Sequence, residues 1–437
     1  MTRYSIALCG GVSLLAVATS AFAQQAAPAA PDTAQTVVIT GSRIVRNGYS
    51  APTPVTVATT AELQATTPSN IPDGLNKLPV FAGSSTSAGG TNAVGGSGGG
   101  VPNLQGGNYM DLRDMGAIRT LILLDGRRVA PTALNGQVDT NTLPEMLVQR
   151  VDIVTGGASA VYGSDAVVGV VNFVLDKNYT GLKAYGQVGD STYGDDRSYR
   201  FGVAGGSSFL DGRAHVIASY EQYTSDGINS HSDRPWSADT PDYTGNGTAA
   251  NPFKLVTNAS LNNATQGGLI TSGTLANKYQ FTNSGLVAFN PGTTTGTSTI
   301  STNGQGASYT GLPLVAPTQT YQGFMRGQYD VTNDIQAYLQ LSDTESKVWG
   351  ATNQNAAATP ATISGSNPYL TPAEQAQLGT SSFTFSRLNR DLAAYSDLDQ
   401  LTDDLSVTAG LSGKAFGDFK WDAYYSHGSS IDRKSVV

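Results

Sequence analysis

Two stretches of sequence decide the fold, LRDMGAIRTLILLDGRRV at residues 112–129 and LVQRVDIVTGGASAVYGSDAVVGVVNFVL at residues 147–175. The apolar run Thr120–Leu124 predicts a strand, Asp125-Gly126 predicts a two-residue turn with positive φ, and Arg127–Val129 returns as the partner strand. We therefore expect a β-hairpin in the first stretch.

The segment between the two stretches predicts a short helix. Thr142 stands three residues ahead of Glu145, with Pro144 in the first turn, which is the pattern of a capped helix start. We expect this helix to run toward Gln149 and a strand at Val151–Val154 to follow it.

The second stretch predicts two reversals and a buried strand. Gly156-Gly157 allow a tight reversal, and Gly163-Ser164-Asp165 mark another. Val167–Leu175 is apolar at nearly every position, as a strand that is covered on both faces would be.

Taken in this order, R-T-L-I-L-L-D-G-R-R-V and V-D-I-V-T-G-G-A-S-A-V-Y-G-S-D-A-V-V-G-V-V-N-F-V resemble the plug domain of TonB-dependent outer-membrane receptors. The resemblance covers roughly the first two-fifths of the chain. It implies an α+β plug domain followed by the first strands of a large antiparallel transmembrane β-barrel. The T-G-G-A-S-A-V-Y-G-S-D-A form is similar to that of receptors of aquatic α-proteobacteria. A small soluble α+β domain that shares these turns is the alternative.

The resemblance also implies roles for residues of the motif. Glycines permit the turns, and charged groups in or beside a wet lumen pair with the barrel wall and hold the plug. Solvated surface charge is the other interpretation of each charged residue. The motif residues are Arg113, Asp125, Gly126, Arg127, Gly156, Gly157, Tyr162, Gly163, Asp165, Gly169 and Asn172, and the charged set also includes Arg128.

The N-terminus has the features of an export signal. Arg3 precedes an apolar stretch from Ile6 to Val17, and Ala21-Phe22-Ala23 gives the small-x-small pattern of a cleavage site. The stretch is shorter than the about 20 apolar residues of a spanning helix, so we expect residues 1–23 to be a signal peptide. Cys9, the only cysteine, lies inside it, so the mature protein would have no thiol.

A tether and a lone β-branched run follow. Residues 24–34 are mostly Ala, Pro and Gln, which predicts a flexible leader. Residues 35–41 contain Val37, Val38, Ile39 and Thr40, a run that suits a strand adding to a partner's sheet edge. The family has its TonB box here, so the resemblance implies that these four residues contact the periplasmic protein TonB. The run could instead be the first strand of the plug.

Residues 42–178 are expected to be the plug domain, and the composition changes after them. Aromatic and β-branched residues then alternate with polar ones, which is the pattern of a lipid-exposed barrel wall with a wet lumen, although a soluble β-sandwich alternates similarly. We assign residues 179–437 to a partial outer-membrane β-barrel. The runs that predict strands are 182–188, 197–205, 213–223, 321–329, 334–342, 405–412 and 419–425.

The connections between these runs are of two kinds. Short turns are expected at residues 206–212, 332–333 and 417–418, and long loops at about 224–320 and 346–402. Loops of that length argue against an ordinary compact domain. On a transport barrel they would lie on the extracellular side, with a strand near residues 285–289, and would set specificity together with the plug loop at 83–109.

The predicted strands are too few to enclose the plug. A plug of about 130 residues has a radius of gyration of about 14 Å, whereas a barrel of about eight strands has room only for its own side chains. An open half barrel would expose unpaired backbone edges to hydrocarbon. We therefore expect this chain to be the N-terminal part of a longer receptor or a truncated product. The resemblance implies that the complete barrel closes with about 22 strands.

The composition argues against other classes of function. The chain has 25 Lys and Arg against 33 Asp and Glu, a net charge of −8, which disfavours nucleic acid as a partner. His215, His231 and His427 have no metal-site spacing, so no metal, cofactor or catalytic residue is expected. Gly95–Gly99 matches a nucleophile elbow in letters only, because no strand precedes it and no helix follows it.

The sequence thus predicts an energy-coupled receptor and transporter of the Gram-negative outer membrane rather than an enzyme. It would contact outer-membrane lipid, bind a scarce nutrient such as a ferric siderophore, cobalamin or an oligosaccharide, and import it with energy from TonB. A passive porin or a surface-binding β-barrel protein is the alternative, and neither would need a TonB box or a plug.

Overall fold

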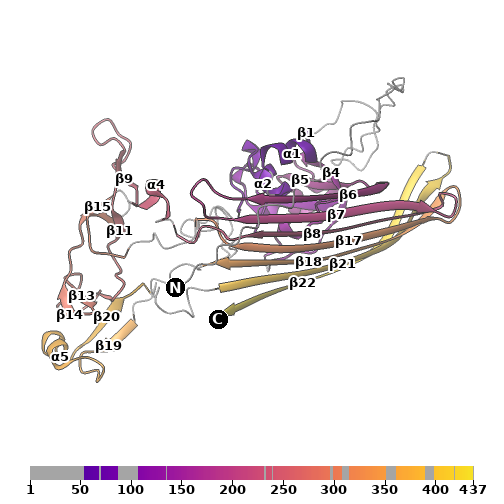
Figure 1. Ribbon diagram of the computed structural model, residues 1–437. Helices are drawn as coiled ribbons and strands as arrows, with labels where there is room; N and C mark the ends of the chain where they lie inside the picture. Colours follow the sequence, from indigo (N-terminus) through magenta and orange to yellow (C-terminus); the bar gives the residue numbers. More distant parts are fainter. Residues whose placement is uncertain are drawn as a thin grey trace, which may run out of the picture.

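A computed structural model describes residues 54–67, 70–86, 107–133, 135–230, 233–238, 240–295, 299–307, 314–350, 361–388, 398–417 and 419–436. In this part of the chain an N-terminal α+β domain lies against one face of a long antiparallel sheet, and smaller sheets extend beyond one end of it (Figure 1). The TonB-box run at residues 37–40 and the glycine tract at 95–99 lie outside the described residues.

The N-terminal domain is built on a five-stranded sheet of order β1-β4-β5-β2-β3. Only β2 and β5 of these neighbours run parallel. The strands are β1 (Val55–Thr59), β2 (Thr120–Leu124), β3 (Arg127–Arg128), β4 (Val148–Val154) and β5 (Gly169–Leu175), and the helices are α1 (Thr60–Thr66), α2 (Ile71–Asn76) and α3 (Ser159–Tyr162). Short 3-10 turns are η1 (Pro79–Phe81), η4 (Leu112–Asp114), η5 (Ala117–Arg119), η6 (Thr140–Thr142) and η7 (Ser164–Ala166).

The predicted hairpin is confirmed. Asp125 and Gly126 have φ of 53° and 77°, as a two-residue hairpin turn requires, and Leu124 pairs with Arg127. The Gly126 N–H donates to the Asn172 side chain of β5 at 2.8 Å, which ties the turn to the neighbouring strand. The strand β5 is buried on both faces, also as predicted.

The predicted helix at residues 142–149 is wrong. Thr140–Thr142 forms a single 3-10 turn, and Leu143 is extended with φ −90° and ψ 138°, as expected of a residue before proline. The Glu145 carboxylate does not cap a helix at Thr142, because it accepts instead from the N–H of Ile71, the first residue of α2, at 2.7 Å. The strand β4 therefore begins at Val148, earlier than predicted.

The core of the domain has one layer on each side of this sheet. The larger layer packs α1, α2 and the inner faces of β2, β4 and β5, with Ile71, Leu75, Leu147 and Phe173 fully buried. It continues into the long sheet through Ala204, Ile217 and Phe324. Among the described residues, no helix is long and apolar enough to cross a membrane.

The long sheet has seven strands in the order β6-β7-β8-β17-β18-β21-β22, all antiparallel. Each of the seven predicted runs from 182–188 to 419–425 falls on one of them. Within the described part of the chain, neither β6 nor β22 pairs with a further strand, so this sheet is not closed. The strands are β6 (Gly181–Gly189), β7 (Ser198–Phe209), β8 (Ala214–Ser225), β17 (Thr318–Asp330), β18 (Ile335–Gly350), β21 (Leu398–Ala415) and β22 (Phe419–Val436).

One predicted turn is displaced. β7 continues through 206–209, and the turn lies at Leu210, Asp211 and Gly212, all with positive φ. Gly206 belongs to the strand because the Tyr179 carbonyl oxygen lies 1.9 Å from where its Cβ would stand. Glycine is therefore required at position 206 because two backbone segments approach closely there, and not because the chain reverses.

The polarity of the long sheet is inverted relative to a water-soluble one. Inward-facing residues of β17 that are buried include Thr318, Thr320, Gln322 and Arg326. The alternate positions of the sheet carry exposed apolar side chains, for example Tyr199 (50%), Phe201 (53%), Leu339 (46%) and Leu405 (48%). The outside of the sheet is thus apolar, and the side that faces the N-terminal domain is polar.

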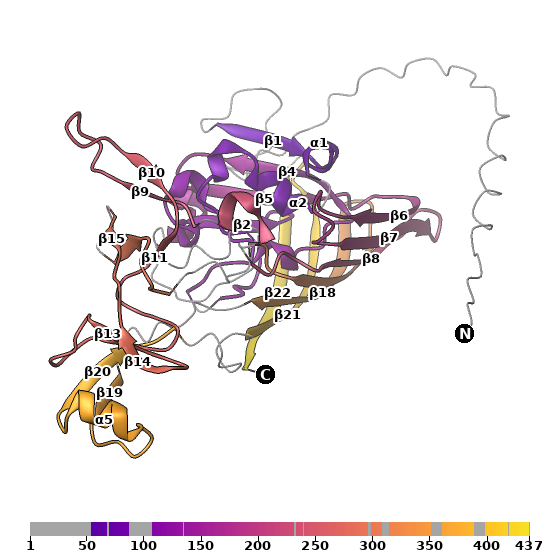
Figure 2. The ribbon, with the colours of Figure 1, turned by 60° about the vertical axis from the view of Figure 1, so that its left-hand side comes forward.

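The two long loops are not structureless. Strands β12 (Leu269–Ile270), β13 (Tyr279–Thr282) and β14 (Gly285–Ala288) of the first loop join β19 (Ala361–Ser364) and β20 (Ser382–Ser386) of the second in one sheet (Figure 2). Ile270 pairs with Phe385 across the two loops. The strand expected near 285–289 is β14. Helix α5 (Pro372–Leu378) completes this unit, and Ile270, Leu286 and Phe383 form its core.

The first loop also forms two smaller sheets. β9 (Asp242–Thr244) pairs with β10 (Lys254–Val256), next to the short helix α4 (Pro235–Ala238). β16 (Ile300–Thr302) pairs with both β11 (Ala259–Leu261) and β15 (Thr293–Thr294).

Candidate functional site

The N-terminal domain is held against the long sheet by charged contacts at two levels. One level lies toward the short turns and uses Arg127 of β3. The other lies farther along the strands, toward the long loops, and uses Glu145. The two arginines that make these contacts, Arg127 and Arg200, come from opposite partners, the first from the domain and the second from the sheet.

Arg127 connects β3 to two strands of the long sheet. Its Nη2 donates to the Tyr338 hydroxyl of β18 at 2.8 Å and to the Asp422 carboxylate of β22 at 2.9 Å. Its guanidinium lies over the rings of Tyr338 and Tyr424, at 4.7 and 4.9 Å from their centroids. Tyr338 fits here because Gly410 opposite it has no side chain: a Cβ would stand 2.4 Å from the Tyr338 oxygen.

The second level is a buried triad, Glu145, Arg200 and Glu221. Arg200 of β7 donates from Nη2 to Glu145 at 2.9 Å, and from Nε and Nη2 to Glu221 of β8 at 3.1 and 2.7 Å. The three side chains are only 2–4% exposed. The Tyr185 hydroxyl donates to the other oxygen of Glu221 at 2.7 Å. Burial of its carboxylate raises the pKa of Glu145, and the charge of Glu221 acts in the same direction. The charge of Arg200 offsets only part of this rise.

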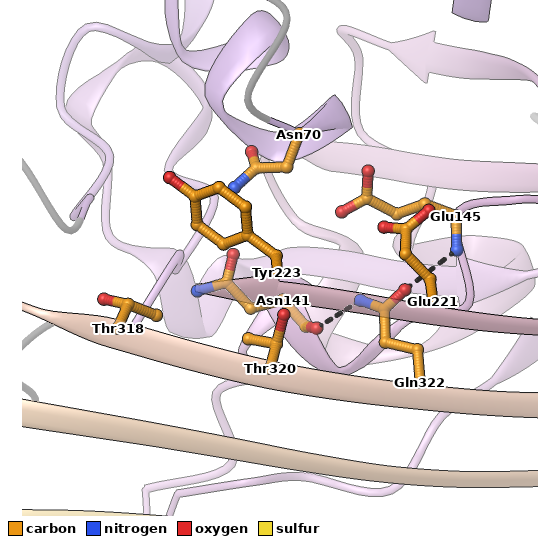
Figure 3. A pocket seen from close by; sticks show the side chains of 8 residues that line it. All are labelled: Asn70, Asn141, Glu145, Glu221, Tyr223, Thr318, Thr320 and Gln322. Carbon is orange, nitrogen blue, oxygen red and sulfur yellow. Dashed lines mark hydrogen bonds between the residues drawn. The ribbon is translucent and has the colours of Figure 1, made fainter. Parts of the chain in front are cut away.

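A small polar cavity adjoins the triad, between the domain and the long sheet (Figure 3). Gln322 of β17 bridges it at one side, accepting from the Glu145 N–H at 3.2 Å and donating to the Asn141 carbonyl at 2.7 Å. The cavity is lined by Asn70, Asn141 and Glu145 of the domain and by Glu221, Tyr223, Thr318, Thr320 and Gln322 of the sheet.

A hydrogen-bonded network inside the domain supports the cavity wall. The Asp139 carboxylate accepts from the backbone N–H groups of Asn108 at 2.8 Å and Asn141 at 3.0 Å. The Asn108 amide in turn donates to the Asn141 side chain at 2.8 Å. Burial raises the pKa of Asp139 to about 6, against the effect of these two donors.

The sequence of this domain matches a known family. Residues 47–170 fit the model described as TonB-dependent Receptor Plug Domain. Residues 47–170 form a plug domain of the kind found in TonB-dependent receptors. The family comprises receptors and transporters of the Gram-negative outer membrane and is not a class of enzymes, so the two charged levels are contacts of a plug with its sheet.

Solved structures similar to the chain include a mutant of the ferric enterobactin receptor PfeA from Pseudomonas aeruginosa in complex with enterobactin (13% identity, TM-score 0.46). Two others are the siderophore receptors PirA (16%, 0.45) and PiuA (15%, 0.39) from Acinetobacter baumannii. The alignments cover 87%, 86% and 88% of this chain but only 42%, 40% and 48% of those proteins. The chain thus spans less than half of their length.

The structure separates the motif residues of the plug by environment. Arg127 contacts the long sheet, with Asp125 beside it at 3.8 Å and bound to Lys177 at 3.1 Å. Arg128 instead stays within the plug, where it donates to Asp165 at 2.5 Å and to the Tyr162 carbonyl. The hydrogen bond from Arg128 to the Asp165 carboxylate lowers the pKa of Asp165. Arg113 is exposed on the plug surface, with φ 59°.

The positions of the motif glycines differ in whether, and why, they require a residue without a side chain. Gly163 has φ 88°, which favours glycine, as the predicted reversal requires. Gly156 and Gly157 do not have positive φ, and a Cβ on Gly157 would meet nothing closer than 3.5 Å, so the predicted need for glycine there is not supported. Gly169 is needed because β4 passes too close for any side chain.

Sequence reasoning missed the triad. The sequence pattern predicts a helix cap at Glu145 and includes Arg200 only as one residue of the predicted strand 197–205. The available signal was that Arg200 and Glu221 are charged residues on inward-facing positions of neighbouring strands. Among the described residues no group of three His, Cys, Asp or Glu is arranged to hold a metal ion.

Proposed function

We propose that this protein is a TonB-dependent outer-membrane receptor that binds a scarce nutrient at the cell surface and imports it into the periplasm. The observation that carries the proposal is the inverted polarity of the long sheet behind a plug. Apolar side chains outside and polar ones inside suit a wall between lipid and a wet lumen. The open edges of β6 and β22 would require further strands to complete such a barrel.

The proposal assigns a task to each segment. Residues 1–23 direct export, 24–34 form a flexible leader and 35–41 hold the TonB box. Residues 42–178 form the plug, and 179–437 contribute strands to the barrel, with extracellular loops at about 224–320 and 346–402. The shared sheet of β12 and β20 supports loops that act together on the ligand side.

Energy for uptake would come from TonB. The outer membrane contains no nucleotide and, being porous, holds no ion gradient, so concentrative import needs work delivered from the inner membrane. In the proposal Val37, Val38, Ile39 and Thr40 pair with TonB through main-chain hydrogen bonds, and the pull rearranges the plug. A passive porin is not favoured, because a plug seated by two charged levels would only obstruct it.

Replacing Val38 with proline tests the coupling. Proline removes a backbone N–H and would break the added strand, so uptake should be abolished while ligand binding to cells is retained. Val38→Ala is the matched control, because it keeps the N–H and should keep most uptake. Unchanged accumulation of ligand by cells with Val38→Pro would contradict the proposal.

The ligand class is tested by induction and growth. Ferric siderophores, cobalamin and oligosaccharides are the candidate ligands. Expression of the gene would be compared under iron, cobalamin and carbohydrate limitation, and the inducing nutrient would then be offered to a deletion strain. Growth of the deletion strain equal to wild type on each of them would contradict a role in their uptake.

A further inference from the structure

The triad carries more negative than positive charge. Two carboxylates, Glu145 and Glu221, share the single guanidinium of Arg200. Among the described residues, no other ion pair reaches either carboxylate. When all three groups are ionised, the site has a net charge of −1 in surroundings that exclude water. Such a charge is costly to bury, so the site favours uptake of one proton.

The hydrogen bonds indicate which carboxyl group takes that proton. Glu221 accepts two bonds from Arg200 and one from the Tyr185 hydroxyl, all three of which stabilise an ionised carboxylate. Glu145 accepts one bond from Arg200 and one from the Ile71 N–H. Burial raises the pKa of Glu145. The proton therefore belongs on Glu145.

The charged groups around Glu145 also favour its protonated form on balance. Besides Arg200 of β7 and Glu221 of β8, the carboxylate of Asp73 in α2 adds a further negative charge. Tyr223 of β8 lines the same cavity, and Gln322 of β17 contributes no charge. Tyr185 of β6 faces the site through Glu221. Among the described residues Arg200 is the cation that contacts the two carboxylates, and it is shared. Lys183 of β6 acts on Glu221 electrostatically but forms no ion pair with it in this part of the chain.

The residues of the triad come from two parts of the protein, the long sheet and the plug. Arg200 and Glu221 lie on neighbouring strands of the long sheet, so they remain together as a neutral pair if the plug moves. Glu145 belongs to the plug and would leave with it. Departure of Glu145 therefore leaves no unpaired charge buried in the sheet.

We propose that seating of the plug on the sheet is linked to a proton: the seated plug holds one on Glu145 and gives it up when this part of the plug leaves the sheet. Once in water, Glu145 returns to the ordinary acidity of a glutamate. Between the ordinary pKa and the raised one, the seated state binds more protons than the released state. Seating is then firmest in acid and weakens as the pH rises through that window. This inference concerns the plug contact alone and does not depend on transport.

The test is hydrogen–deuterium exchange of the segment 139–148 in the full chain, at about pH 5.5 to 8.5 and corrected for the intrinsic exchange rate. One linked proton allows a loss of protection of up to about tenfold for each pH unit within the window. We expect this alkaline loosening in the wild type. Protection that does not change with pH would overturn the proposal.

Two variants separate this linkage from a general effect of alkali. Glu145→Gln removes the titrating group, so its protection should be flat above about pH 7, where Asp139, with its pKa of about 6, is already ionised. Glu221→Gln leaves a neutral pair of Glu145 and Arg200, so its alkaline loosening should disappear. Asp165→Asn, which changes an exposed ion pair within the plug, is the control and should keep the wild-type profile. A wild-type profile in Glu145→Gln would also overturn the proposal.

A measurement on the wild type covers the case in which these variants do not fold. Infrared spectroscopy detects the carbonyl stretch of a protonated, buried carboxyl group. Asp139→Asn and Asp404→Asn identify the shares of that band that belong to these two other buried carboxyl groups. We expect a remaining band at neutral pH that disappears over the pH range of the exchange. Absence of such a band at neutral pH would show that Glu145 is ionised when seated. Failure of Val38→Pro to block uptake would leave both readouts unchanged, so the two proposals fail separately.

Discussion

Gly169 of β5 passes so close to Val154 of β4 that a Cβ on the glycine would stand 2.1 Å from the Val154 carbonyl oxygen. The Leu112 side chain would lie 2.7 Å away on another side, so the added atom could not be accommodated by a rotamer change alone. The central strands of the plug therefore depend on a residue without a side chain at this point.

Gly169→Ala should loosen the plug core. We expect a cost of roughly 1–3 kcal/mol from overpacking, seen as faster hydrogen exchange in β4 and β5. Gly157→Ala is the matched control in the same motif, because its Cβ would meet only ordinary contact at 3.5 Å. Equal effects of the two substitutions would contradict this explanation.

Arg127 and Asp422 should be energetically coupled. Their ion pair is partly exposed, with 14% and 38% of the side chains accessible, so we expect a coupling of about 1 kcal/mol in a double-mutant cycle of Arg127→Ala and Asp422→Ala. Exchange of the β2–β3 hairpin amides measures it. Strictly additive effects would mean that the tyrosine rings alone hold the guanidinium.

Arg200 should be the most sensitive residue of the plug contact. Arg200→Met leaves Glu145 and Glu221 buried together without a counter-charge, which should cost roughly 3–5 kcal/mol. Arg213→Met, at an exposed arginine beside the short turn after β7, should cost far less. Protease sensitivity of the plug in the two variants gives the comparison, and similar sensitivity would argue against a structural triad.

Asp139 should make the plug less stable as the pH rises. Its folded pKa of about 6 lies above the ordinary value of 3.8, so its contribution is fully present below the ordinary value and is lost as the pH rises through about 6. Asp139→Asn should remove this part of the pH dependence from the exchange of residues 107–111. A fall in protection toward acid that depends on Asp139 would have the wrong sign.

The two long loops should loosen together. Phe383 belongs to the second loop and is 4% exposed, in a core with Ile270 and Leu286 of the first. Phe383→Ala should cost this unit roughly 3 kcal/mol and increase proteolysis of the first loop as well as the second. Cleavage that rises only in the second loop would show that the shared sheet does not couple them. Tyr369→Ala, at a fully exposed side chain of the second loop, is the control.

Local patterns were sufficient for much of the fold. The Asp125-Gly126 turn needs only its two residues, and the alternation of apolar and polar residues at 197–205 is sufficient to predict a strand. These features depend on the conformation of a two-residue turn and on the alternation of side chains along one strand. Neighbouring residues in the sequence determine both. The parallel pairing of β2 with β5 could not be read in the same way.

Long-range partners explain the failures. Thr142 to Glu145 has the letters of a capping box, but Glu145 binds Ile71 and Arg200, which are 74 and 55 residues away. The β12–β20 pairing joins residues more than a hundred positions apart, so the long loops offered no local sign of a common core. Tertiary contacts decide such segments, and a single sequence does not display them.

The joining of β12 to β20 also sets an order of assembly. Strands β17 and β18 lie between the two loops in the sequence, so the shared outer sheet is completed only after both strands have been made and the second loop has reached the first. Until then the edge of β12 stays free to pair with a foreign strand. Interruption of biogenesis between these points would therefore yield intermediates prone to self-association at the end of the sheet that carries the long loops.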